Sequence, residues 1–302
     1  MNRIVNVERL RILAAFGIVW FHAGNVYGRS IGYAGLPIFM MIFCALIIST
    51  QSASTYSDYI KKKSLRLIKP WIFWSCIYLS LKLIKQIYYN EPFTNEFKRY
   101  VFFVGSAVHL WYLPYAFVIS LLLFPLKKLS GKGHQFIVAS LLAGAGFILI
   151  FLCRIAMVHL NIPVPFPQWT FALPAIPLGV TIGIMYSAGS NKNKHIFFTA
   201  MIATTILINI YGNISYDKIL IPYSYAIILV CGAFTWSGKF DFISHEWASL
   251  CFGIYLIHPL VASVLSRSCM GQVNPYCMIV IVFLLSSVIT LVLKKTPLKQ
   301  FA

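Results

Sequence analysis

Two ionisable residues on the first apolar segment could do chemistry inside a membrane. Arg11 and His22 both lie in the stretch 7–28. An α-helix turns about 100° and rises about 1.5 Å per residue, so the two side chains share one face and lie about 16 Å apart along the axis. Ionisable side chains at membrane depth are costly and usually face a bundle interior, where they have a function. The alternative is that His22 is a neutral packing residue and Arg11 a charge that orients the helix.

A second histidine is expected at the same depth on a late helix. The stretch 249–261 also starts at the inner edge, and His258 follows at the same rise as in the first helix. Tyr255, three residues earlier, lies on the same face. Pro259 removes a backbone donor and can leave a carbonyl free to line a cavity. Two midplane histidines on different helices favour a functional site over packing.

A basic stripe precedes another apolar segment. Lys62, Arg66 and Lys69 follow an i, i+4, i+7 spacing, so they share a face if they form a short helix leading to Pro70. Three cations beside Arg11 suit a ligand rich in phosphate. The alternative is that these charges set topology and meet anionic lipid.

Aromatic residues surround a third histidine in the stretch 108–114. His109 is expected in the first turn of a helix that enters from the outer side. Trp111 and Tyr112 are residue types of the interfacial belt of membrane proteins. The alternative is that His109 and its neighbours contact a polar acceptor that arrives from outside.

The composition is that of a protein with many membrane spans. Of the 302 residues, 59% are hydrophobic and only 11% charged. The net charge of +18 is explained by the positive-inside rule, because the basic residues gather in short loops; binding to nucleic acid is not indicated. The seven cysteines form no CxxC pair, so neither a metal site nor a redox motif is predicted.

We therefore expect an all-α, polytopic helical bundle with about ten transmembrane helices, formed by a single domain over residues 1–302. The basic loops place the N-terminus inside, and an even number of crossings then places both termini in the cytoplasm. No internal repeat is visible. The expected apolar segments are 10–28, 34–52, 70–88, 107–125, 135–158, 169–187, 195–212, 218–236, 247–267 and 274–293.

Taken together, these stretches resemble the integral-membrane acyltransferase-3 family, which includes bacterial O-acetyltransferases of O-antigen, capsule and exopolysaccharide. Arg11 and His22 match the family's R-x10-H motif, after an acidic-x-L-R opening that begins at Glu8. The stretch KSLRLIKPWIFW resembles the family's basic segment and proline, HLWYLPY its H-L-W-F-L segment, and FGIYLIHPLV its late H-P motif. The resemblance covers residues 8–262 in order.

The chain departs from the family pattern at two places. Phe43 and Cys44 stand where the second helix of the family commonly has small residues, which puts a close backbone approach there in doubt. Lys69 stands where arginine is common, and lysine cannot make the bidentate contact with phosphate that arginine makes.

The resemblance implies transfer of an acyl group, most often acetyl, from cytoplasmic acyl-CoA to a hydroxyl of a surface polysaccharide or its lipid-linked oligosaccharide precursor. It implies acetyl-CoA as the acyl donor, no metal, and a multi-pass location in the bacterial inner (cytoplasmic) membrane, in contact with membrane lipid. The phosphates of CoA are expected at four basic residues: Arg11, Lys62, Arg66 and Lys69.

The remaining roles are expectations of the same kind. His22 deprotonates the attacking hydroxyl or takes the acyl group itself. Glu8, three residues before Arg11, orients the guanidinium. His258 and Tyr255 polarise the carbonyl or relay the proton. The acceptor arrives past the segment formed by His109, Trp111 and Tyr112.

Two rival functions remain open at the level of sequence. One is a proton-coupled transporter or flippase of glycan precursors, in which midplane histidines relay protons. The other is a non-catalytic subunit of a polysaccharide export complex. The lack of a clear intramembrane carboxylate and of repeats argues against the transporter.

Overall fold

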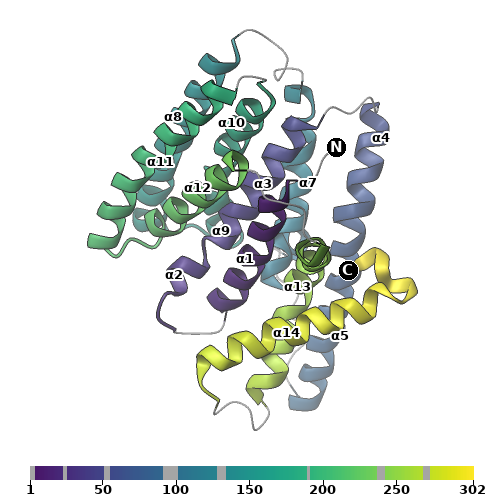
Figure 1. Cartoon of the computed structure of the whole chain (residues 1–302). Helices are drawn as coiled ribbons and strands as arrows, with labels where there is room; N and C mark the ends of the chain where they lie inside the picture. Colours follow the sequence, from purple (N-terminus) through teal and green to yellow (C-terminus); the bar gives the residue numbers. More distant parts are fainter. Residues whose placement is uncertain are drawn as a thin grey trace.

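The computed structural model describes residues 4–22, 26–50, 55–90, 101–127, 134–188, 191–236, 242–267 and 273–302. Within these ranges all regular structure is helical, as the sequence predicts (Figure 1). The helices are α1 (Val5–His22), α2 (Arg29–Gly32), α3 (Gly35–Ser49), α4 (Tyr56–Lys63), η1 (Ser64–Ile68), α5 (Lys69–Tyr89), α6 (Val101–Val104), η3 (Val108–Trp111), α7 (Tyr112–Leu123), α8 (Gln135–His159), α9 (Phe166–Ala172), α10 (Ala175–Ser187), α11 (Asn191–Ile214), α12 (Leu220–Thr235), α13 (Phe242–Arg267), α14 (Pro275–Lys294) and η6 (Pro297–Phe301).

Seven helical segments of the described chain are long and apolar enough to cross a membrane. They are Arg29–Ser49, Tyr56–Tyr89, Gln135–His159, Phe166–Ser187, Lys192–Ile214, His245–Arg267 and Pro275–Lys294. Two shorter apolar helices cover Val108–Leu123 and Leu220–Thr235. The all-helical membrane class is confirmed, whereas the count of ten crossings and the cytoplasmic termini stay predictions.

Helix α1 lies between two packed cores. Its residues Val7, Leu10 and Ala14 belong to a core built mainly from α3, α7, α8, α10 and α12. Ala15 and Val19 belong to a second core, with α5, α13 and α14. Figure 1 shows α1 near the middle of the molecule, with α3 on one side and α13 on the other. The helix that carries Arg11 and His22 is therefore held on both sides.

Small residues allow helices to approach closely where the sequence left the approach in doubt. A Cβ at Gly35 would lie 2.3 Å from the carbonyl oxygen of Ala14, so α3 meets α1 backbone to backbone. A Cβ at Gly179 of α10 would lie 2.6 Å from the carbonyl oxygen of Met41 and 2.8 Å from the Cβ of Cys44. The small residue at this contact thus stands on the partner helix, which accommodates Cys44 on α3.

The basic segment is not a separate short helix that ends before the next span. Helices α4, η1 and α5 form one continuous segment over Tyr56–Tyr89, and η1 is a π-helix. Pro70 has no N–H to donate to the carbonyl oxygen of Arg66, four residues earlier. The π-helix η1 ends at Ile68, two residues before Pro70. A π-turn adds one residue per turn and so rotates the residues that follow relative to those before it.

An ion pair ties α8 to the segment that leads into α12. Arg154 Nε donates to Asp217 Oδ2, and the side chain of Asp217 is only 8% exposed. Asp217 Oδ1 accepts the backbone N–H groups of Ile219 and Leu220 at 2.8 and 2.9 Å. Burial by itself raises the pKa of Asp217, but the hydrogen bonds from Arg154 and from the backbone outweigh it and hold the pKa below its usual value.

Asp217→Ala is expected to lower the free energy of unfolding by about 1–3 kcal/mol, because it removes a helix cap and leaves Arg154 without its partner. Thermal unfolding of the detergent-solubilised protein measures the change. Asp58→Ala is the matched control, since Asp58 also accepts a hydrogen bond near a helix start but is exposed. Equal shifts of the unfolding temperature for the two variants would show that the Arg154–Asp217 pair stabilises the fold no more than the exposed contact of Asp58 does.

Candidate active site

Helix α1 brings its two ionisable residues to the positions that helix geometry predicts. It runs without interruption over Val5–His22, so the spacing between Arg11 and His22 holds. Arg11 is half-buried and lines a cavity, and His22 lies in the last turn with its side chain partly accessible. Glu8 lies in the first turn of the same helix, one turn before Arg11, and is half-buried.

Three histidines from separate elements gather near the far end of α1. The ring centroids of His22 and His258 are 5.2 Å apart, and those of His109 and His258 are 6.0 Å apart. His258 is fully buried, and the Nε2 atoms of both His109 and His258 lack a hydrogen-bond partner among the described residues. The sequence placed His22 and His258 at similar depth; the structure adds His109, from η3, to the same cluster.

The proton position on His258 follows from its backbone contacts. Its Nδ1 lies 2.9 Å from the carbonyl oxygen of Tyr255 and 3.1 Å from that of Ile254. Carbonyl oxygens only accept, so we assign the proton to Nδ1, and Nε2 of the neutral ring then carries the lone pair. Pro259 has no N–H to give to the Tyr255 carbonyl, which leaves this oxygen open to the ring. His258 is thus preset as a proton acceptor through Nε2.

Two tyrosine hydroxyls fix α13 against its neighbours around this cluster. The Tyr255 hydroxyl donates to the backbone carbonyl of His109. The Tyr78 hydroxyl of α5 donates to the carbonyl of Leu256 at 2.8 Å. The hydroxyl of Tyr255 is therefore engaged within the protein, and its role in polarising a substrate carbonyl stays a prediction.

A cavity of about 470 Å³ is lined by Tyr255, and none of the three histidines is among its lining residues. Tyr112 and Tyr255 line it, with ring centroids 5.8 Å apart, and the Tyr255 ring lies 6.3 Å from that of His258. Tyr255 therefore connects the cavity wall to the histidine cluster. The basic residues that line the cavity are Arg11, Lys62, Lys63, Arg66 and Lys127.

Two of these cations were not predicted as site residues. The Lys63 ammonium lies 4.8 Å from the Phe43 ring and 5.3 Å from the Tyr59 ring, both of which line the cavity. Lys127 also lies 5.3 Å from the Tyr59 ring, and burial lowers its pKa. Lys63 belongs to the basic stretch 61–69, and Lys127 belongs to the next basic loop along the chain. The sequence places both on the same side of the membrane, and this is the signal that could have identified them as site residues.

Lys69 lies apart from the other cations of the stripe. Its ammonium donates to Gln300 Oε1 at 2.7 Å and lies 5.3 Å from the Phe301 ring, in the C-terminal helix η6. Lys62 and Arg66 share the cavity, but Lys69 is not among its lining residues. The π-helix η1 between them explains the difference, since it changes the face on which Lys69 emerges.

The aromatic segment after His109 is not a membrane-interface belt. Trp111 is only 4% exposed and packs at 5.5 Å, between ring centroids, against Tyr115. Tyr112 is half-buried and lines the cavity. His109 itself packs edge to face against Tyr78 at 5.0 Å. Tyr112 thus belongs to the cavity wall, His109 to the histidine cluster and Trp111 to the hydrophobic core.

The fold and the site define a membrane-embedded helical protein with a cationic cavity next to clustered histidines. The model of the acyltransferase-3 family, described as an acyltransferase domain, matches residues 4–295, and the chain belongs to this family. Comparison with curated proteins and with solved structures gave no match. Membership implies acyl transfer by a multi-pass membrane protein.

Proposed function

We propose that this protein transfers an acyl group, acetyl in the first instance, from cytoplasmic acetyl-CoA to a hydroxyl of a cell-surface glycan or of its lipid-linked precursor. The observation that carries the proposal is one helix, α1, which contributes Arg11 to the cationic cavity and His22 to the histidine cluster. We place the protein in the bacterial inner membrane, with the basic end of the bundle facing the cytoplasm.

The cationic cavity suits the donor. CoA carries several phosphate groups, and guanidinium and ammonium groups are the side chains that hold phosphate. Arg11, Lys62, Lys63 and Arg66 line the cavity from two helices, so they can face one phosphate-rich ligand from two sides. Lys69 takes no part in this binding, because it is directed to Gln300. The thioester then extends past Tyr112 and Tyr255 toward His22, over about 16 Å.

The histidine cluster suits the proton transfer. His22 takes the proton of the acceptor hydroxyl while the hydroxyl oxygen attacks the thioester carbonyl carbon. The carbon–sulfur bond breaks, CoA leaves as the thiolate, and the thiolate takes up the proton, so the products are an ester and free CoA. His258, with its lone pair on Nε2, accepts a hydrogen bond or the proton from His22 and relays it. His109 also packs against His258, and in this proposal the acceptor enters past His109.

A covalent route uses the same residues. The His22 ring attacks the thioester itself, CoA leaves, and the acyl-imidazole then passes its acyl group to the acceptor hydroxyl. Mass measurement of the protein after exposure to acetyl-CoA without acceptor separates the two routes, because only the covalent route leaves an acetyl group on the chain.

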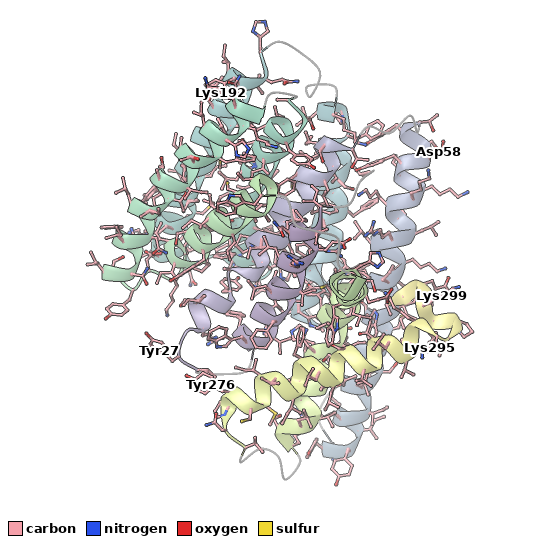
Figure 2. The ribbon with its side chains drawn as sticks, viewed as in Figure 1. Tyr27, Asp58, Lys192, Tyr276, Lys295 and Lys299 are labelled. Atoms are coloured by element: carbon pink, nitrogen blue, oxygen red, sulfur yellow. The ribbon has the colours of Figure 1, made fainter. Side chains whose placement is uncertain are left out.

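Binding of radiolabelled acetyl-CoA to purified protein tests the donor assignment. Lys62→Gln and Arg66→Gln are each expected to weaken binding about tenfold, because each removes a charged hydrogen-bond donor to phosphate. Lys192→Gln is the matched control, since Lys192 lies in the first turn of α11 and far from Asp58 of α4 in Figure 2. Unchanged binding in both cavity variants would contradict the assignment of this cavity to CoA.

A further inference from the structure

A second cavity, separate from the cationic one, is lined by residues of α5, α13, α14 and η6. Its volume is about 470 Å³, and all its lining residues are apolar or aromatic. Representative residues are Trp74 and Ile77 of α5, Leu260 and Val264 of α13, Ile289 of α14 and Phe301 of η6.

The walls of this cavity present no polar group that a water-soluble ligand would need. The indole N–H of Trp74 is used inside the protein, where it donates to the backbone carbonyl of Phe301 at 2.8 Å. Phe301 also stacks on Phe73 of α5, with ring centroids 4.1 Å apart. The cavity is thus shaped by a C-terminal helix that is fixed to α5, and it suits hydrocarbon alone.

Basic residues surround one end of the same cavity. Leu293, Leu298 and Phe301 line this end, and the neighbouring chain carries Lys294, Lys295 and Lys299. Lys294 is held by the carbonyl and hydroxyl oxygens of Ser249 at 2.8 and 2.7 Å. Lys295 and Lys299 are exposed, and Figure 2 shows both at the end of α14 opposite Tyr276. Lys69, bonded to Gln300, adds a further charge nearby.

An apolar slot with a cationic mouth matches an amphiphile with a hydrocarbon tail and an anionic head. We propose that the cavity binds one acyl chain of an anionic phospholipid, with the lipid phosphate at Lys295 and Lys299. The basic mouth lies beside Lys69, which starts α5 directly after the π-helix that contributes Arg66 to the cationic cavity. A phospholipid whose phosphate lies at these lysines fits this position.

The lipid would support α13, the helix that carries His258 of the histidine cluster. Leu260 of the cavity wall follows His258 by two residues, and Ile257 of the wall precedes it. A bound acyl chain therefore fills the space behind α13 next to the turn that Pro259 leaves without a hydrogen bond. This lipid site does not depend on the proposed acyl-transfer function.

Fluorescence quenching by lipids with brominated acyl chains tests the proposal, because Trp74 lies in the cavity wall. The protein is placed in vesicles that contain brominated phosphatidylglycerol or brominated phosphatidylcholine at equal content, and the Trp74 signal is obtained by difference from Trp74→Phe. We expect stronger quenching by phosphatidylglycerol. Lys295→Gln and Lys299→Gln should each reduce this preference roughly fivefold. Lys192→Gln with Lys194→Gln should leave it unchanged.

A second variant tests the cavity rather than its mouth. Val264 is 60% exposed and lines the cavity, so Val264→Phe fills the space without disturbing the core. It should reduce quenching of Trp74 by both lipids while the charged mouth is intact. Equal quenching by the two lipids would mean ordinary boundary lipid and would overturn the proposal. Displacement of the brominated lipid by a polyprenyl phosphate, but not by added phosphatidylglycerol, would overturn the choice of phospholipid.

Discussion

Replacing His22 by alanine is expected to lower the rate of acyl transfer by about 10²–10⁴-fold while the protein level in the membrane stays normal. His22 lies in the last turn of α1 with part of its side chain accessible, so its loss leaves no large cavity in either core. It is also the histidine of the cluster that lies on the same helix as Arg11, which lines the cationic cavity. Acetyl transfer to glycan, measured in membranes with labelled acetyl-CoA, gives the rate.

The control for this variant is His195→Ala. His195 is an exposed histidine of α11. This helix packs in the core with α3 and α12 and not in the core that contains α13. The variant should leave the rate unchanged. If His22→Ala keeps the wild-type rate while membrane levels are equal, His22 is a packing residue and the proton must be taken by another group.

The second large effect is expected at His258, through its Nε2 atom. His258→Asn preserves a donor that can reach the carbonyl oxygens of Ile254 and Tyr255, but it removes the Nε2 lone pair. The rate should fall about 10²-fold, while donor binding stays within about twofold of wild type. Parallel measurements of transfer rate and acetyl-CoA binding separate the two quantities.

Pro259→Ala examines the same arrangement from the backbone. Alanine supplies an N–H for the carbonyl of Tyr255, which then competes with the ring of His258 for this oxygen. Both tautomers of His258 become available, so the transfer rate should fall several-fold without loss of folded protein. Nitrogen NMR of labelled histidine reports the tautomer directly. A fully active His258→Asn protein would contradict the role of Nε2.

Helix geometry predicted the parts of the site that lie on uninterrupted helices. Arg11 and His22 keep their spacing because α1 has no proline and no break. His258 comes to lie beside His22, with ring centroids 5.2 Å apart, although α13 begins at Phe242, earlier than the sequence predicted. Tyr255 shares its face, as a spacing of three residues requires. The all-helical class followed from the length and apolar character of the segments.

Other features depend on contacts that no local pattern encodes. The face on which Lys69 emerges depends on the π-helix η1, and a single sequence gives no periodic signal for one. Lys127 lines the cationic cavity because α7 packs beside η1, although the two helices are far apart in the sequence. The tautomer of His258 depends on a proline and two carbonyls, and was visible only once their distances were known.

The most direct test of the account is the acyl content of the surface glycan, measured by NMR of polysaccharide from cells that carry wild type, His22→Ala or Arg11→Ala, with membrane levels checked by immunoblot. The account predicts that both variants lose the acyl signal at normal protein levels, since one removes the proton acceptor and the other a donor-binding cation of the same helix. Full acylation in cells that carry His22→Ala would contradict catalysis through α1.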